Sequence, residues 1–121
     1  MRRPLEGVPI SVKENYIVKG TDATCGIASR CFQPSEEDGL LVQLLKEAGA
    51  FPYVKTNVPQ ALISFETTNN IYGTSLSPWN KLRTPGGSTG GEAGLLAARA
   101  SPLGVGTDIG GSIRIPCHFS G

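Results

Sequence analysis

The chain has 121 residues, of which 39% are hydrophobic, and its 11 basic and 10 acidic side chains leave a net charge of +1. This length suits one small domain, and a charge so close to zero gives no electrostatic support for binding nucleic acid or an anionic membrane surface. No apolar run approaches the roughly 20 residues that span a bilayer, and no signal peptide is recognised. One histidine and three cysteines, none spaced as in a zinc knuckle, predict no metal site and reduced thiols in an intracellular protein.

The first predicted element is a short strand over residues 8–13. Val8, Ile10 and Val12 alternate with other residue types, and the segment ends at Lys13. Alternation of this kind is typical of a strand with one apolar face.

A helix is predicted after a loop over residues 20–33. The segment 34–38 is acidic, which suits a first helical turn, and Ser35 is the candidate N-cap. Leucines at helical spacing follow as far as Ala48, and Gly49 closes the helix.

The remaining elements alternate between strands and helices. In chain order they are a strand at 51–55, a short helix at 59–65, a loop at 69–84, a helix of small residues at 92–100, a strand at 103–106 and a turn at 109–115. Such alternation predicts an α/β fold in which helices pack on a sheet.

Glycine is the informative residue type. The chain has 16 glycines, and nine of them lie in residues 86–111, where apolar residues between them argue against a flexible linker. Ser88 lies in the sequence GGSTGG at 86–91, and Ser112 ends the sequence GGS at 110–112. Backbone N–H groups in such loops are open to a bound group, because glycine has no side chain to cover them.

Known nucleotide-binding patterns do not fit these loops. Neither loop has the Lys-Ser/Thr pair of a Walker motif, and Ile109 stands where the dinucleotide fingerprint requires its third glycine. Ser88 matches the nucleophile elbow G-x-S-x-G, but residues 83–85 are not strand-like, so the required context is absent. The single histidine, His118, is given no role.

A lysine is the other base available to a serine. Its ordinary pKa is about 10.4, so desolvation or a nearby cation must lower the pKa before it can accept a proton. Lys13 ends an apolar strand, a place compatible with burial. The residue pattern alone nevertheless favours a solvated surface charge.

Two parts of the chain resemble the amidase signature family. They are GVPISVKE at 7–14 and the segment that begins PGGSTGGE at 85–92 and ends GVGTDIGGSIR at 104–114. The resemblance implies a partial amidase-signature domain over residues 1–121, truncated at both ends, with a mixed sheet and flanking helices. The sequence TNVPQ at 56–60 is similar to the branch of the family that cleaves fatty acid amides.

The resemblance also implies a Ser-Ser-Lys triad. In it Ser112 is the nucleophile, Ser88 is a bridging serine that follows a cis peptide bond from Gly87, and Lys13 is the base. Backbone N–H groups around the nucleophile would form the oxyanion hole, namely those of Ile109, Gly110, Gly111 and Ser112.

Further residues are assigned by the same resemblance. Leu62 and Phe65 would border an acyl channel, although core packing is the better interpretation of both from the sequence alone. Thr89 stands where the family usually has a second serine, and Asp108 and Arg114 are expected to support the nucleophile loop.

The implied function is a serine hydrolase that cleaves carboxylic amides, fatty acid amides first, through an acyl-enzyme and without a metal or organic cofactor. One alternative is the amidase subunit of a tRNA-dependent amidotransferase, and the other is an inactive chain that only binds a ligand or partner. The implied partners are a lipid amide or other small amide and a second copy in a homodimer. Association with an endomembrane would come only from segments outside this chain, and these residues alone are expected to be inactive and poorly soluble.

Overall fold

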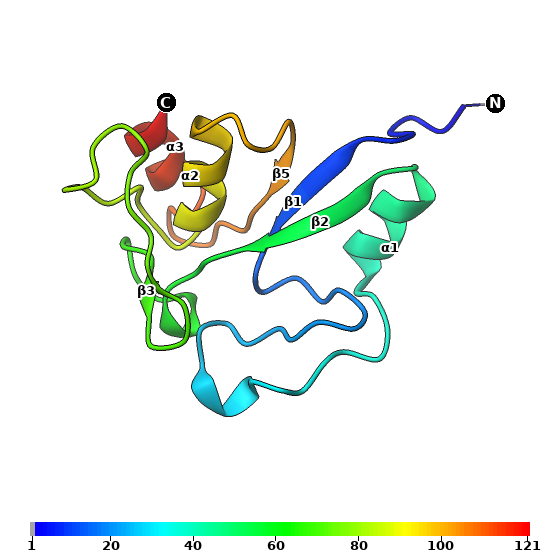
Figure 1. Ribbon diagram of the computed structural model, residues 1–121, viewed down its shortest axis with the longest axis horizontal. Helices are drawn as coiled ribbons and strands as arrows, with labels where there is room; N and C mark the ends of the chain where they lie inside the picture. The colour runs from blue at the N-terminus through cyan, green and yellow to red at the C-terminus, as the bar shows by residue number, and fades with distance from the viewer. Residues whose placement is uncertain (1) are drawn as a thin grey trace.

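A three-stranded parallel sheet forms the centre of the computed structural model, which describes residues 2–121 (Figure 1). Its strands are β1 (Pro9–Lys13), β2 (Phe51–Thr56) and β5 (Gly104–Val105), in the order β2-β1-β5. The central strand β1 is covered on both faces, since its residues 10–13 are all buried. One face of this strand is apolar, as predicted, but the opposite face with Ser11 and Lys13 is buried as well. The α/β class is confirmed.

Three helices flank the sheet, α1 (Leu40–Glu47), α2 (Gly90–Ala97) and α3 (Arg114–Ser120). Helix α1 lies between β1 and β2 in the chain, and α2 lies between β2 and β5. The two crossovers run in opposite directions along the sheet, so right-handed connections put their helices on opposite faces. Figure 1 shows this arrangement, with α2 and α3 together on the side away from α1.

The smaller elements lie outside this sheet. Strands β3 (Thr68–Asn69) and β4 (Gly73–Thr74) form a separate antiparallel pair, and short 3₁₀ segments occupy η1 (Ala28–Arg30) and η2 (Gln60–Leu62). A mixed sheet was expected. In the described residues the main sheet is parallel, and the antiparallel hairpin is separate from it.

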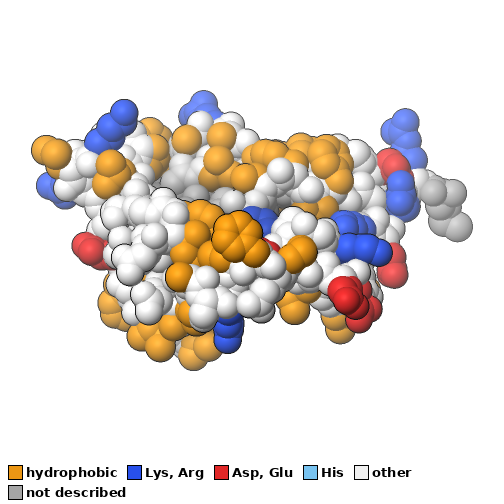
Figure 2. Space-filling view, turned by 60° about the horizontal axis from the view of Figure 1, so that its bottom comes forward, with side chains coloured by type: hydrophobic (Ala, Val, Ile, Leu, Met, Phe, Trp, Pro, Cys, Tyr) orange, Lys and Arg blue, Asp and Glu red, His pale blue; other side chains and the backbone are white. Residues whose placement is uncertain are grey.

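The hydrophobic core is small and centred on β1. Ile10, Val12 and Ala50 are buried together, and Leu45 and Val105 pack against them. Many apolar side chains stay exposed, and Figure 2 shows several patches of them on one face. Among residues 2–121, no helix is long and apolar enough to cross a membrane.

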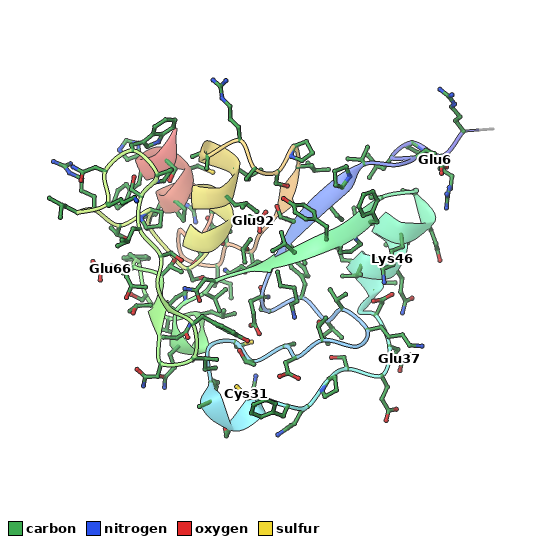
Figure 3. The ribbon with its side chains drawn as sticks, viewed as in Figure 1. Glu6, Cys31, Glu37, Lys46, Glu66 and Glu92 are labelled. Atoms are coloured by element: carbon green, nitrogen blue, oxygen red, sulfur yellow. The ribbon has the colours of Figure 1, made fainter. Side chains whose placement is uncertain are left out.

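A buried carboxyl ties α2 to the sheet. Glu92, 2% exposed, points from the helix toward the strands (Figure 3). Its carboxyl accepts hydrogen bonds from the Ser11 and Thr56 hydroxyls on β1 and β2. A side chain at Gly104 on β5 would overlap this carboxyl group, which explains the glycine there. One residue therefore fixes the helix that follows Ser88 against all three strands.

Several predicted elements have other bounds. Helix α1 begins after Gly39 with no side-chain cap, so Ser35 is not the N-cap. The helix predicted at 59–65 is wrong, because only η2 is present and Ala61 within it has a left-handed backbone. The segment 69–84, predicted as loop, contributes to the β3–β4 hairpin, and the turn predicted at 109–115 runs into α3.

Candidate active site

Lys13 is completely buried at the carboxyl end of β1. Its Nζ donates hydrogen bonds to Ser88 Oγ at 2.7 Å and to Thr107 Oγ1 at 2.8 Å. Burial lowers the pKa of Lys13 from 10.5 to about 8, against opposing attraction from Asp108 and Cys25. The interpretation of Lys13 as a solvated surface charge is therefore wrong. With this pKa, part of the Lys13 population carries a neutral amine near physiological pH.

Ser88 is 1% exposed and lies in the turn that leads into α2. The peptide bond between Gly87 and Ser88 is cis. A Cβ atom at Gly87 would lie 2.8 Å from the backbone oxygens of Ser64 and Glu66, so only glycine fits before this serine. The close approach of segment 64–66 to the glycine loop thus explains one of the glycines that the sequence singled out.

Ser112 lies in a loop that Asp108 organises. The Asp108 carboxylate accepts hydrogen bonds from the backbone N–H groups of Gly111 at 2.8 Å, Ile113 at 2.9 Å and Arg114 at 3.0 Å. The Arg114 side chain pairs with it at 2.7 Å and holds the pKa of Asp108 well below its usual range. These contacts fit the structural support expected of Asp108 and Arg114.

The two glycine loops are in direct contact. Thr89 N–H donates to the Ser112 carbonyl at 3.1 Å, and the Thr89 hydroxyl donates to the Thr107 carbonyl at 3.1 Å. Thr89 therefore keeps the bonding capacity of the serine it replaces in the family pattern. Its methyl group faces Gly106, where a Cβ atom would overlap it.

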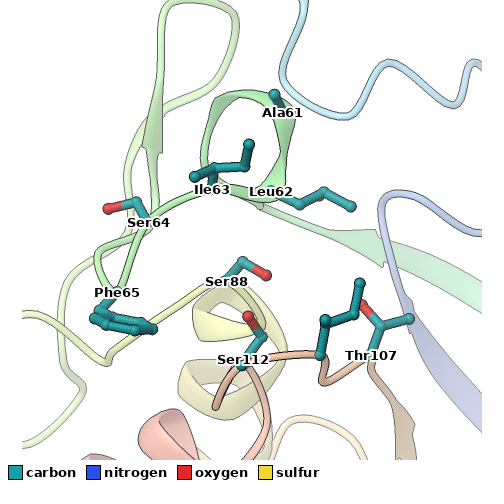
Figure 4. Close-up of a pocket in the computed structure, with 10 residues that line it drawn as sticks. Ala61, Leu62, Ile63, Ser64, Phe65, Ser88, Thr107 and Ser112 are labelled. Atoms are coloured by element: carbon teal, nitrogen blue, oxygen red, sulfur yellow. The ribbon is translucent and has the colours of Figure 1, made fainter.

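Both serines open into one pocket of about 570 Å³ (Figure 4). Its lining comes from the loop that contains Ser112, the Ser88 turn and the segment after β2: Ala61, Leu62, Ile63, Ser64, Phe65, Ser88, Thr107, Ile109, Gly110 and Ser112. In Figure 4 the segment 61–65 arches over the two serines. None of the lining residues is charged.

The residues assigned by resemblance have distinct environments. Leu62 and Phe65 line the pocket, and Phe65 is 59% exposed, so core packing is the wrong interpretation of Phe65. Ile109 and Gly110 also line the pocket, whereas Gly111 is buried and its N–H is engaged by Asp108.

Thr107 is the residue that sequence reasoning missed. It bonds Lys13 and lines the pocket. Its position beside Asp108 in the second glycine-rich segment was the available signal, but nothing in that pattern separates a lysine partner from an ordinary loop threonine.

A sequence model of the Amidase family matches residues 1–121. This chain belongs to the amidase family. It is 47% identical over 121 residues to "Fatty acid amide hydrolase 1" of Caenorhabditis elegans, covering 100% of this chain and 21% of that protein. It is 55% identical over 118 residues to "Putative amidase kk1C" of Curvularia clavata, covering 98% of this chain and 22% of that protein.

Solved structures give the same family fold. The structure described as "Fatty acid amide hydrolase" superposes with a TM-score of 0.94 at 39% identity, over 98% of this chain and 21% of that one. The chain thus spans about a fifth of the length of the amidase relatives it matches. The α/β fold with helices on a parallel sheet is the amidase fold over this portion.

Proposed function

We propose that the protein containing this chain hydrolyses carboxylic amides, with Ser112 as nucleophile, Ser88 as bridge and Lys13 as base. The observation that carries the proposal is the 2.7 Å hydrogen bond from Lys13 Nζ to Ser88 Oγ, at the edge of the pocket that Ser112 shares. A buried lysine with a lowered pKa beside a serine is the arrangement that activates a hydroxyl nucleophile.

The proposed reaction passes protons along these three groups. Neutral Lys13 takes a proton from Ser88 as Ser88 takes one from Ser112, and the Ser112 oxygen forms a bond to the amide carbonyl carbon. Collapse of the tetrahedral intermediate breaks the C–N bond, and the proton returns through Ser88 to the leaving amine. Water then attacks the Ser112 ester by the same route and releases the acid.

The relay needs a hydrogen bond between the Ser88 and Ser112 hydroxyls. No hydrogen bond joins the Ser88 and Ser112 hydroxyls, although both face the same pocket. Catalytic hydrogen bonds commonly tighten only when substrate binds. We therefore assign formation of the Ser88–Ser112 bond to the substrate complex.

The carbonyl oxygen of the intermediate requires N–H donors. The Gly111 N–H is engaged by Asp108, so the proposal uses those of Ile109, Gly110 and Ser112. Loss of one such donor typically costs about 3 kcal/mol of transition-state stabilisation. By organising this loop, Asp108 acts as a positioning residue for the nucleophile.

The uncharged wall supports an apolar acyl group. Leu62, Ile63 and Phe65 line the pocket together with the serines, and none of its lining residues carries a charge that could pair with the ammonium or carboxylate of glutamine. We therefore propose fatty acid amides as substrates ahead of glutamine, the substrate of the amidotransferase alternative. Homodimerisation and endomembrane association stay predictions of the family resemblance.

The test replaces the nucleophile. Ser112→Ala in the full-length protein should abolish hydrolysis of oleamide and labelling by a fluorophosphonate probe, while Ser77→Ala, a buried serine outside the pocket, should change neither. Labelling that persists at another serine would sink the assignment of Ser112. Faster turnover of glutamine than of oleamide by the wild type would favour the amidotransferase alternative.

A further inference from the structure

The wall of the pocket has an unusual backbone. Ala61 and Leu62 are consecutive residues with φ angles of 54° and 62°, in the left-handed region that disfavours every residue with a Cβ atom. Such a conformation is unfavourable for each of these residues and persists only where the surrounding structure imposes it. This turn leads into residues 63–65, which line the pocket that contains the two serines.

The loop at residues 24–26 supplies that support. The Ala61 N–H donates to the Cys25 carbonyl at 2.8 Å. The Gly26 backbone packs so closely on the segment that a Cβ atom there would lie 3.0 Å from Gln60 Cα and 3.1 Å from the Pro59 carbonyl oxygen. The pocket wall therefore lies against a second loop, far from it in sequence.

The loop 24–26 is itself held by a buried carboxylate. Glu14 is 4% exposed, and its Oε1 accepts bonds from Thr24 N–H at 2.6 Å and from the Thr24 hydroxyl at 2.8 Å. Its Oε2 accepts from Cys25 N–H at 2.7 Å. The Thr24 hydroxyl in turn accepts from Gly26 N–H at 3.0 Å. All three residues of the loop are thus tied, directly or through one hydroxyl, to Glu14.

We infer that Glu14 is a positioning residue that sets the acyl-side wall of the pocket, through residues 24–26 and the left-handed turn at Ala61 and Leu62. This inference rests on the proposed amide hydrolysis. Glu14 directly follows Lys13 in the chain. The end of β1 therefore carries both the proposed base, Lys13, and the residue that holds the pocket wall, Glu14. Loss of Glu14 should therefore weaken the binding only of substrates that contact residues 62–65. Loss of Lys13 should slow the hydrolysis of every substrate.

The sharpest variant is Glu14→Gln. A glutamine keeps the shape but has only one acceptor oxygen, so in either orientation its NH₂ group faces a backbone N–H of Thr24 or Cys25. Asp22→Asn is the matched control, because the Asp22 carboxylate accepts from Phe32 N–H and Gln33 N–H in the same region and has no hydrogen bond to the pocket wall. Each variant places an amide NH₂ group opposite a backbone N–H group. Only Glu14→Gln does so in the loop that bonds Ala61.

The measurement compares a dodecanoyl and an acetyl p-nitroanilide in the full-length protein. Glu14→Gln should raise KM for the long substrate about tenfold with kcat within about twofold, and leave kcat/KM for the short substrate within about twofold. Asp22→Asn should change neither substrate. Adding Ala61→Gly to Glu14→Gln should lower KM for the long substrate part of the way back to the wild-type value, because glycine adopts a positive φ without the steric penalty.

The opposing results are distinct. Equal losses on both substrates, no loss on either, or no recovery with Ala61→Gly would overturn the role of Glu14. If Glu14→Gln does not fold, Thr24→Val removes one hydroxyl of the same cradle and must show the same split at smaller size, or the inference fails. A wild-type protein whose Ser112 does not react with a fluorophosphonate overturns the proposed function, and the role of Glu14 with it.

Discussion

At the scale of single residues, Lys13 shows how burial changes the chemistry of a side chain. It has no carboxylate among its hydrogen-bond partners, only the Ser88 hydroxyl and the hydroxyl and carbonyl of Thr107. Neutral partners do little to hold a proton on an amine, and loss of water disfavours the charged form. The lowered pKa of about 8 follows from this combination.

Thr107 offers a test of this balance. Thr107→Val keeps the branched shape and removes the Oγ1 atom that accepts a bond from Lys13 at 2.8 Å. Protonated Lys13 loses an acceptor, so the pKa of Lys13 should fall further and the acid limb of the pH–rate profile should move to lower pH. We expect kcat to fall about tenfold, the usual size of one lost hydrogen bond to a charged or reacting group.

Thr107→Ser is the control, since serine keeps the hydroxyl. Its acid limb should match that of the wild type. An acid limb that shifts equally in both variants, or that shifts to higher pH in Thr107→Val, would show that the Thr107 hydroxyl does not bond Lys13 during turnover.

The sequence allowed part of this site to be predicted. Glycine density marked Ser88 and Ser112, because close backbone packing and open N–H groups leave a compositional trace. The burial of Lys13 leaves none, since it depends on β1 lying between two strands that come about 40 and 90 residues later in the chain. Only the family resemblance supplied the lysine before the fold was known.

At the scale of elements, the position of α2 depends on a carboxyl group with no cationic partner. The Ser11 and Thr56 hydroxyls donate hydrogen bonds to Glu92, and Ser11 Oγ also lies 2.9 Å from Ser101 Oγ. Burial raises the pKa of Glu92. This cluster joins β1, β2 and α2, and Ser88 lies two residues before the first residue of that helix.

Glu92→Gln tests the electrostatic cost of the cluster. A folded-state pKa above the unfolded value means that the contribution of Glu92 to stability is present at low pH and is lost as pH rises through the folded-state pKa. Glutamine cannot ionise. The free energy of unfolding of Glu92→Gln, relative to that of the wild type, should therefore increase in denaturant titrations as pH rises above 4.5, the ordinary pKa of this carboxyl.

The same titrations can contradict the assignment. A difference between Glu92→Gln and wild type that stays constant with pH would mean that the Glu92 carboxyl has the same pKa in the folded and unfolded states. A difference that decreases as pH rises would mean that the folded state favours the carboxylate.

Element prediction succeeded where local signals and tertiary contacts agree. Helix α1 and strands β1 and β2 were located within a few residues from the spacing of their apolar residues, although several leucines of α1 are exposed. The segment 59–65 has helical apolar spacing, but its backbone is set by the loop at 24–26 rather than by its own propensity. Helix α3 was missed because Pro116 and the glycines before it are poor local indicators of a helix.

At the scale of the whole molecule, the described chain buries few apolar residues and exposes many. Large exposed side chains occur on α1, on the pocket wall and around Trp79, and Figure 2 shows apolar patches on the face it displays. Contiguous exposed apolar surface of this kind favours association. The expectation that these 121 residues alone are poorly soluble and inactive stays a prediction.

The pocket also has exposed apolar side chains at its rim. Its floor holds both serines, and its wall is the segment 61–65, yet Ile63 is 85% exposed and Ile109 is fully exposed. Apolar residues at the rim of a pocket contact an apolar ligand or further protein surface.

The most direct test of the central claim is the pH dependence of kcat/KM for oleamide in the full-length protein. With neutral Lys13 as base and its pKa at about 8, kcat/KM should rise about tenfold per pH unit below pH 8 and level off above it. Lys13→Ala should be slower by at least about a hundredfold and should lose this limb. A wild-type profile that is flat between about pH 6 and pH 9, a range that includes that pKa, or an unchanged profile in Lys13→Ala, would contradict the account.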